Sequence, residues 1–297
     1  KKILISDATL RDGSHACAHQ LNLTQIASYC LAADKAGIPI VEVGHGNGLG
    51  ASSLQVGLSK ESDISMLETA RKSLLKSKLS IHVIPGFATI KKDLSTALDI
   101  GVDIVRVASH CTEADITQRH IEFVRGKGKE AYGVLMMTHM ANADVLLEQA
   151  TKMQLYGAEG IILMDSAGAY LPKDVREKVT VLVNGLNVPV GFHAHNNLGM
   201  GIANSLTAIE SGAKIIDGTS KGFGAGAGNA QLEVLVAVLE KMGYITGVDL
   251  YKILDTADFA EKEIVNSVPL IKSDSIISGL TGVFSGFSKH VTRISKE

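Results

Sequence analysis

The stretches Gly160-Ile161-Ile162-Leu163-Met164 and Val188-Pro189-Val190-Gly191-Phe192 flank a more polar segment that begins Pro172-Lys173-Asp174. Both outer stretches are almost continuously apolar, as parallel strands are when both faces are covered. A proline followed closely by an acidic residue is typical of a helix start. The sequence therefore predicts a strand, a helix and a second, parallel strand in this part of the chain.

The same alternation of strands and helices extends over most of the chain. Six further apolar runs predict strands at Ile3–Ser6, Ile40–Val43, Ser80–Ile84, Ile104–Val107, Ala131–Met136 and Ile215–Gly218. Helix-start signals lie between the runs at Asn22, Asp63, Asp115 and Asn142, and the glycines suited to end helices are Gly37, Gly101, Gly157, Gly212 and Gly243. Eight such units predict a (β/α)₈ TIM barrel. A doubly wound open sheet would have fewer strands and a phosphate-binding glycine pattern after the first.

The pattern changes after Gly243. A helical stretch runs from about Asp249 to Val265, and a second one starts at Ser273 after Pro269. We therefore expect a TIM-barrel catalytic domain over residues 1–265 and the start of a small C-terminal helical extension over residues 266–297.

Composition excludes several classes of function. The net charge is −2, with acidic and basic residues mixed along the chain, so no basic surface for nucleic acid is expected. No apolar run is long enough to predict a membrane span, and no signal peptide is evident at the first residues. The three cysteines, Cys17, Cys30 and Cys111, lack CxxC spacing, which argues against disulfides and favours a cytoplasmic location.

Polar residues gather where predicted strands end, which is the catalytic face of such barrels. His193 and His195 stand two residues apart on a strand, so both imidazoles point to one face and can share a metal ion. Asp12, after the first strand, would add a carboxylate and leave positions open for substrate. The alternative is that the two histidines only cap a loop and fill a polar network.

Neighbouring residues suggest the chemistry. Arg11 could stabilise the enolate formed when a carbon–carbon bond next to a carbonyl breaks, or it could be a structural ion pair. His15 is a candidate general base. The run from Gly222 to Asn229 could cradle phosphate or let substrate approach the backbone closely. Lys221 could form a Schiff base, although a surface or loop-anchoring role is preferred.

The stretch Asp7-Ala8-Thr9-Leu10-Arg11-Asp12-Gly13-Ser14-His15 resembles the signature of the DRE-type metal-dependent barrels, the superfamily of HMG-CoA lyase. Further segments resemble the 4-hydroxy-2-oxovalerate aldolases, which cleave a 4-hydroxy-2-oxo acid to pyruvate and an aldehyde. These segments begin at His45, Val105, Met136, His193 and Gly224, and the resemblance runs from Ile3 to about Ser288.

This resemblance implies a set of roles. Asp12, His193 and His195 would bind the metal, usually Mn²⁺, with Mg²⁺, Co²⁺ or Zn²⁺ as alternatives. Arg11 would hold the enolate, His15 would act as base, and Ser166 would hold the substrate carboxylate, with His193 also lining the substrate. The family also implies a CoA-acylating aldehyde dehydrogenase as partner, and we expect an oligomer.

Three positions depart from the family pattern. Phe284 stands where these aldolases carry a tyrosine, and Lys221 and His82 stand where apolar or small residues are usual. His82 and Phe284 are therefore predicted to line the part of the pocket that binds the aldehyde. That aldehyde could be larger than the usual one of the family, or aromatic. Two other functions stay open: a Claisen-type synthase that joins an acyl-CoA to a 2-oxo acid, and a non-catalytic barrel that scaffolds a dehydrogenase.

Overall fold

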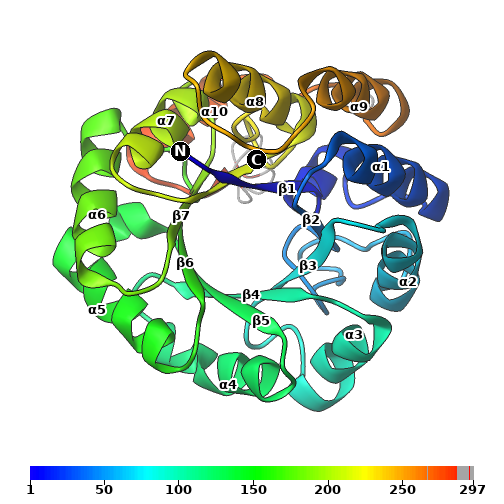
Figure 1. Cartoon of the computed structure of the whole chain (residues 1–297), viewed down its shortest axis with the longest axis horizontal. Helices are drawn as coiled ribbons and strands as arrows, with labels where there is room; N and C mark the ends of the chain where they lie inside the picture. The colour runs from blue at the N-terminus through cyan, green and yellow to red at the C-terminus, as the bar shows by residue number, and fades with distance from the viewer. Residues whose placement is uncertain (266, 286–293, 295–297) are drawn as a thin grey trace.

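Eight parallel strands close into a barrel in their order along the chain, with helices around the outside (Figure 1). The computed structural model describes residues 1–265, 267–285 and 294. The strands are β1 Leu4–Leu10, β2 Ile40–Val43, β3 Lys78–Val83, β4 Ile104–His110, β5 Glu130–Met136, β6 Gly160–Asp165, β7 Val190–Ala194 and β8 Ile215–Gly218. Pairing of Leu4 with Ile215 closes the ring between β1 and β8. The predicted TIM barrel is confirmed.

The α-helices alternate with the strands. They are α1 Leu23–Ala36, α2 Asp63–Ser73, α3 Ser95–Ile100, α4 Gln118–Gly126, α5 Ala143–Leu155, α6 Pro172–Gly185, α7 Gly201–Glu210, α8 Leu232–Lys241, α9 Leu250–Glu263 and α10 Ser273–Thr281. Short helical turns lie at η1 Asp12–Cys17, η2 Ile90–Leu94, η3 Ala114–Thr117, η4 Thr138–Met140 and η5 Ser220–Gly222.

Most predicted boundaries hold. Asn22 and Asn142 cap α1 and α5 by accepting backbone N–H groups, and all five predicted helix-ending glycines have positive φ. Helix α2 begins at Asp63, as predicted, with Ser62 as its N-cap. One helix start was wrong: η3 occupies the residues around Asp115, so α4 begins later, at Gln118.

Strand β1 is longer than its sequence predicts. Asp7 and Thr9 are polar and lie beyond the predicted end of the strand at Ser6, yet both are buried within it. The Tyr29 hydroxyl on α1 lies 2.7 Å from Asp7 Oδ2, and the Thr9 N–H donates to Asp7 Oδ1 over 2.9 Å. Hydrogen bonds within β1 and from α1 therefore satisfy these side chains behind the barrel wall, and the strand continues to Leu10.

Strand β7 begins two residues later than predicted. Pro189 has no N–H to donate to a ladder, so Val188 and Pro189 only lead into the strand. The strand continues to Ala194, and His193 pairs in register with Met164 on β6. His193 therefore lies within the strand and not in the loop after it.

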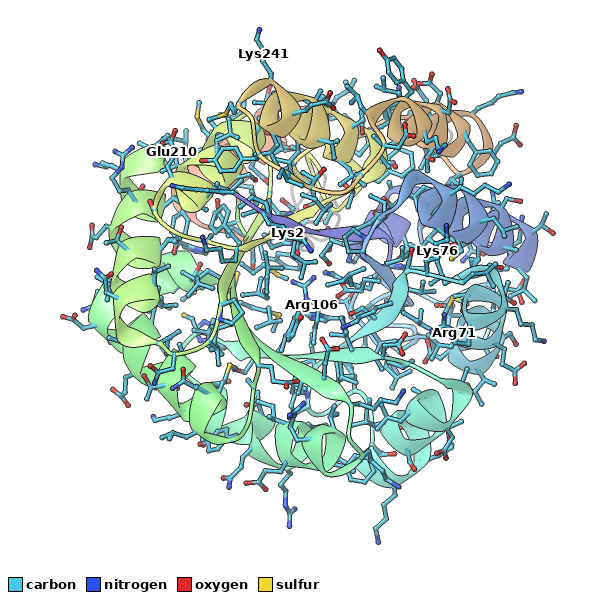
Figure 2. All side chains as sticks on the ribbon, in the orientation of Figure 1. Lys2, Arg71, Lys76, Arg106, Glu210 and Lys241 are labelled. Atoms are coloured by element: carbon cyan, nitrogen blue, oxygen red, sulfur yellow. The ribbon has the colours of Figure 1, made fainter. Side chains whose placement is uncertain are left out.

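Apolar packing fills the space on both sides of the barrel wall. A large cluster lies between strands and helices, and a smaller one inside the barrel contains Ile40, Ile104, Ile162 and Ile215. The small cluster fills the interior with branched side chains, as is typical of this fold. Towards the carboxyl ends of the strands the interior becomes polar, and Arg106 lies near the centre of the barrel (Figure 2).

The last two helices take different places. Helix α9 packs beside α1 and α8 in the outer ring (Figure 1). Helix α10 lies against the loops at the carboxyl ends of the strands: Asn197 after β7 donates to the Ser275 carbonyl over 3.2 Å, and Nε2 of His139 in η4 lies 2.8 Å from the Gly282 carbonyl oxygen. The predicted domain boundary falls at residue 266, and most of the extension after 285 lies outside the described residues. Among the described residues, no helix has the length and apolarity needed to cross a bilayer.

We expect the buried carboxyl of Asp7 to make stability depend on pH. Burial raises the pKa of Asp7 to about 6, whereas the same group in an unfolded chain titrates near 3.8. The folded state therefore binds the extra proton between these values, and stability must fall as pH rises through them. Relative to Asp7→Asn, the unfolding free energy of the wild type should drop by about 3 kcal/mol between about pH 4 and pH 7, measured by urea unfolding. Parallel curves for the two proteins would contradict this prediction.

Candidate metal centre

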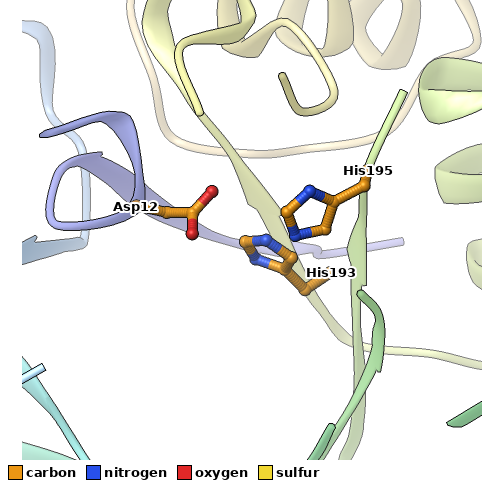
Figure 3. Close-up of side chains that lie close together, drawn as sticks. All are labelled: Asp12, His193 and His195. Atoms are coloured by element: carbon orange, nitrogen blue, oxygen red, sulfur yellow. The ribbon is translucent and has the colours of Figure 1, made fainter. Parts of the chain in front are cut away.

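Asp12, His193 and His195 come together at the carboxyl ends of β1 and β7 (Figure 3). Asp12 begins η1, His193 lies in β7, and His195 directly follows that strand. One ligand atom from each lies within 4.8 Å of the others, and each residue is at most 5% exposed. The predicted trio thus forms one buried cluster of potential metal ligands.

Each of the two histidines has a buried ring nitrogen without a hydrogen-bond partner among the described residues. Nδ1 of His193 lies 2.8 Å from Asp217 Oδ2; since a carboxylate accepts, Nδ1 carries the proton and Nε2 keeps its lone pair. Nε2 of His193 and Nδ1 of His195 are buried and have no hydrogen-bond partner among the described residues. Burial also lowers the pKa of His195 to about 3, so its ring is neutral. A neutral imidazole always keeps one lone pair, so two buried imidazoles beside a carboxylate fit a divalent transition metal.

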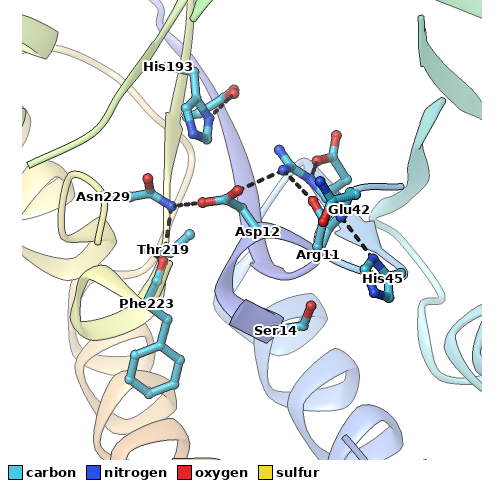
Figure 4. Close-up of polar contacts among 12 residues, drawn as sticks. Arg11, Asp12, Ser14, Glu42, His45, His193, Thr219, Phe223 and Asn229 are labelled. Atoms are coloured by element: carbon cyan, nitrogen blue, oxygen red, sulfur yellow. Dashed lines mark hydrogen bonds and ion pairs between the residues drawn. The ribbon is translucent and has the colours of Figure 1, made fainter. Parts of the chain in front are cut away.

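Asp12 is held as an oriented carboxylate. Nη1 of Arg11 donates to its Oδ1 over 2.8 Å, and Nδ2 of Asn229 donates to its Oδ2 over 2.5 Å (Figure 4). Burial alone would raise the pKa of Asp12, but the Arg11 guanidinium together with His195, His193 and His15 outweighs burial and lowers this pKa well below its usual range. The group is therefore ionised at neutral pH, as a metal ligand must be.

A chain of buried ion pairs crosses the barrel from Arg11 to His193. Arg11 Nε donates to Glu42, Nη1 of Arg106 lies 3.2 Å from Glu42 Oε2, and Nη2 of Arg106 donates to Asp217 over 2.5 Å. Asp217 in turn accepts from His193. Burial would raise the pKa values of Glu42 and Asp217, but the guanidinium groups lower both. The chain therefore joins the loop that carries Asp12 to the strand that carries His193.

The buried charges of this region do not balance. Two guanidinium groups, Arg11 and Arg106, face three carboxylates, Asp12, Glu42 and Asp217, which leaves an excess of one negative charge among these five residues. An uncompensated charge away from water is costly, so the region favours a bound cation.

The glycine-rich loop after η5 supports the carboxylate. Asn229 ends this loop, and a Cβ on Gly224 would lie 3.0 Å from Asp12 Oδ2. A Cβ on Gly228, whose φ is +78°, would lie 1.9 Å from the Gly222 carbonyl oxygen. Glycine is therefore required for the loop to fold onto itself and bring Asn229 to Asp12. These contacts account for the loop without a bound phosphate.

The other predicted site residues lie around the same barrel end. His15 is half-buried in η1, His82 is 2% exposed at the end of β3, and Ser166 follows β6 and accepts from the Met137 N–H over 2.9 Å. Phe284 precedes Ser285, whose hydroxyl accepts from Asn197 over 2.8 Å.

Lys221 points away from the centre. Its Nζ lies 2.7 Å from Asp258 and 3.0 Å from Glu261 on α9, and these partners raise the pKa of the amine. A protonated, paired amine is a poor nucleophile, so the geometry favours the loop-anchoring role over the Schiff base.

Sequence reasoning missed the roles of Asp217 and Asn229. The sequence pattern places Asp217 within an apolar strand, and it places Asn229 at the end of a loop that could cradle phosphate or let substrate approach the backbone closely. The signal for Asp217 was its charge, because an acid inside an otherwise apolar parallel strand needs a buried partner.

Comparison with known proteins agrees with this geometry. The profile of the HMGL-like family matches residues 2–260. A 4-hydroxy-2-oxovalerate aldolase of Spirochaeta aurantia is 64% identical over 295 residues, which cover 99% of this chain and 86% of the relative. One of Pectobacterium atrosepticum is 63% identical and covers 100% and 87%. The chain belongs to the 4-hydroxy-2-oxovalerate aldolases of the HMGL-like family. It is therefore a carbon–carbon lyase of the aldolase type.

Solved structures share the fold of this aldolase at lower identity. HMG-CoA lyase of Bacillus subtilis superposes with a TM-score of 0.77 at 18% identity and covers 93% of this chain and 98% of its own. The carboxyl transferase domain of Rhizobium etli pyruvate carboxylase, solved with pyruvate and biocytin, has a TM-score of 0.82 at 16% identity and covers 99% and 54%. These likenesses support the barrel fold.

We expect Asp217→Asn to weaken metal binding by this aldolase about 10- to 100-fold, because the carboxylate fixes the His193 tautomer and raises its basicity. Mn²⁺ titration by calorimetry measures the effect. Asp103→Asn is the matched control: Asp103 accepts the Leu79 N–H at the amino ends of the strands, far from the cluster along the barrel axis. Equal affinity in all three proteins would refute the assigned role of Asp217.

Proposed function

We propose that this aldolase cleaves a 4-hydroxy-2-oxo acid of the 4-hydroxy-2-oxovalerate type into pyruvate, or a homologous 2-oxo acid, and an aldehyde. The observation that carries the proposal is the buried trio Asp12, His193 and His195 beside the Arg11 guanidinium. The family supports the same reaction, since relatives over 60% identical bear this activity in their names.

Asp12, His193 and His195 would hold a divalent ion, for which we propose Mn²⁺. When bound, such an ion acts as a Lewis acid that polarises the 2-oxo group of the substrate. One carboxylate and two imidazoles leave positions open for substrate oxygen atoms, and this donor set also accepts Co²⁺, Zn²⁺ or Mg²⁺. The choice of Mn²⁺ rests on the family resemblance.

Arg11 would stabilise the negative charge that develops on the substrate. Its Nε donates to Glu42, and its Nη1 donates to Asp12 and to the Gly46 carbonyl. Nη2 is buried and has no partner among the described residues. One N–H₂ group of a rigidly held guanidinium is therefore left for the enolate oxygen, and a prearranged donor of this kind lowers the barrier for charge development.

His15 would act as the general base. Its neutral imidazole takes the proton from the C4 hydroxyl, the C3–C4 bond breaks, and the electron pair of that bond passes into the enolate while the C4 carbon leaves as the aldehyde. Protonation of the enolate at C3 then gives the 2-oxo acid. Ser166 would hold the substrate carboxylate, because its hydroxyl accepts from Met137 and keeps its own hydrogen to donate.

His82 and Phe284 would line the aldehyde side. Burial lowers the pKa of His82 to about 3, so this ring is uncharged and only its nitrogen atoms are polar. Phe284 has no hydroxyl and adds only an apolar surface. We infer that a CoA-acylating aldehyde dehydrogenase takes up the aldehyde and that the chain forms oligomers. The supporting argument is that the aldehyde product is reactive and requires an enzyme that converts it further.

We expect cleavage of 4-hydroxy-2-oxovalerate to require the metal. Activity should appear with Mn²⁺, vanish with EDTA and return with added Mn²⁺, measured as pyruvate release coupled to lactate dehydrogenase. A series of longer and aromatic aldehydes, each tested for condensation with pyruvate, then shows which aldehyde the enzyme accepts. CoA release from acetyl-CoA and a 2-oxo acid would instead indicate the Claisen-type synthase, and metal-bound protein without any carbon–carbon chemistry would indicate a scaffold.

Arg11→Lys should lower kcat by about 100- to 1000-fold, because a lysine cannot contact Glu42 and Asp12 and still offer a donor to the enolate. The measurement is steady-state cleavage at saturating Mn²⁺. Arg71→Lys, a half-buried arginine that pairs with Asp103, is the control and should match the wild type. A rise in KM with kcat unchanged would show that Arg11 only binds the ground state.

A further inference from the structure

Three imidazole rings stand in contact beside the metal centre, and the proposed reaction uses only one of them. The ring centroids of His15 and His19 are 4.7 Å apart with an interplanar angle of 70°. Those of His19 and His45 are 3.8 Å apart at 22°, which is a stacked pair. His45 lies on the Arg11 side of Asp12, opposite Asn229 (Figure 4). His19 thus stands between the proposed base and a second buried ring.

Hydrogen bonds to the backbone fix the His45 ring. Its Nδ1 accepts the Asn47 N–H over 3.0 Å, and its Nε2 lies 3.0 Å from the Gly57 carbonyl oxygen. Because a carbonyl only accepts, Nε2 carries the proton, and both ring nitrogens are satisfied by backbone groups. The ring is therefore held in one tautomer and one orientation.

His19 stacks on His45 and has an unfavourable backbone conformation. Ala18 and His19 both have positive φ, 52° and 62°, a region that residues other than glycine seldom occupy. Nδ1 of His19 accepts from the Gly46 N–H over 3.4 Å and lies 3.0 Å from the Ser14 hydroxyl. Two consecutive strained residues persist only when surrounding contacts define the position, and here those contacts place the ring.

Two glycines make room for the rings. A Cβ on Gly46 would lie 2.4 Å from Nε2 of His15, and a Cβ on Gly57 would lie 2.7 Å from Cδ2 of His19. The Gly46 peptide is also fixed at both ends, since Arg11 donates to its carbonyl over 3.2 Å and His19 accepts its N–H. His15 is therefore bounded by the Gly46 backbone and by the His19 ring.

We propose that His19, stacked on His45, is a positioning residue that sets the orientation of His15 for proton removal from the substrate C4 hydroxyl. This inference rests on the proposed function, because it assigns His15 the role of base. Proton transfer needs a nitrogen-to-oxygen distance near 3 Å, and a ring that rotates freely seldom offers it. The stack restricts His15 without contact between His19 and the reacting atoms.

A comparison of two reactions tests this role. Aldol cleavage requires the base, whereas decarboxylation of oxaloacetate breaks a carbon–carbon bond to give the same pyruvate enolate and CO₂ with no hydroxyl proton to remove. The variant is His19→Asn, because asparagine tolerates positive φ and its Oδ1 can accept the Gly46 N–H, while the ring is lost. We expect kcat for aldol cleavage to fall about 10- to 100-fold, with decarboxylation changed less than about 3-fold.

Two further variants complete the design. His45→Gln should show the same selective loss to a smaller extent, which keeps the proposal testable should His19→Asn fail to fold. His120→Asn, a buried histidine of α4, is the matched control and should leave both rates unchanged. All proteins are assayed as the full chain with Mn²⁺, and thermal melts verify folding.

The outcomes separate the two proposals. Equal losses of both reactions would show that His19 supports only the general structure of the site and would overturn the inference, as would an unchanged rate of aldol cleavage. A wild type without metal-dependent cleavage would overturn the proposed function itself. Selective loss in His19→Asn and His45→Gln supports the positioning role.

Discussion

The structure depends on the chain of buried ion pairs from Arg11 through Glu42, Arg106 and Asp217 to His193. Removing charges from water is costly, and a buried pair repays that cost only with close, well-directed contacts. The barrel provides them, because side chains at the carboxyl ends of different strands point towards a common axis. The same contacts that satisfy the charges therefore fix the relative positions of the Asp12 loop and β7.

The neighbouring loops act on the same few atoms. On one side of Asp12, the glycine-rich loop delivers the Asn229 amide to one carboxylate oxygen, and on the other side Arg11 binds the second oxygen. Arg11 also fixes the Gly46 carbonyl, against whose backbone His15 lies. The carboxylate, the guanidinium and the proposed base thus depend on the same hydrogen bonds and contacts. A substitution at one of them should therefore alter the position of the others.

Sequence reasoning succeeded where a local pattern reports a local structure. Apolar runs showed all eight strands, and the positive φ of Gly37 and Gly101 follows directly from their places after helices. It erred at β1, where Asp7 and Thr9 looked like loop residues. Their burial depends on Tyr29, 22 residues after Asp7, and no local pattern shows that contact.

The sequence by itself determined the barrel, the His193 and His195 pair and the family, because the spacing of apolar, glycine and histidine residues constrains each of them along the chain. Only the tertiary structure decided which groups complete the site. Asp217, Asn229 and His19 act through contacts with residues distant in sequence or through an unusual backbone conformation. Such contacts arise when the barrel closes, since closure brings β1 beside β8 and sets the direction in which each side chain points.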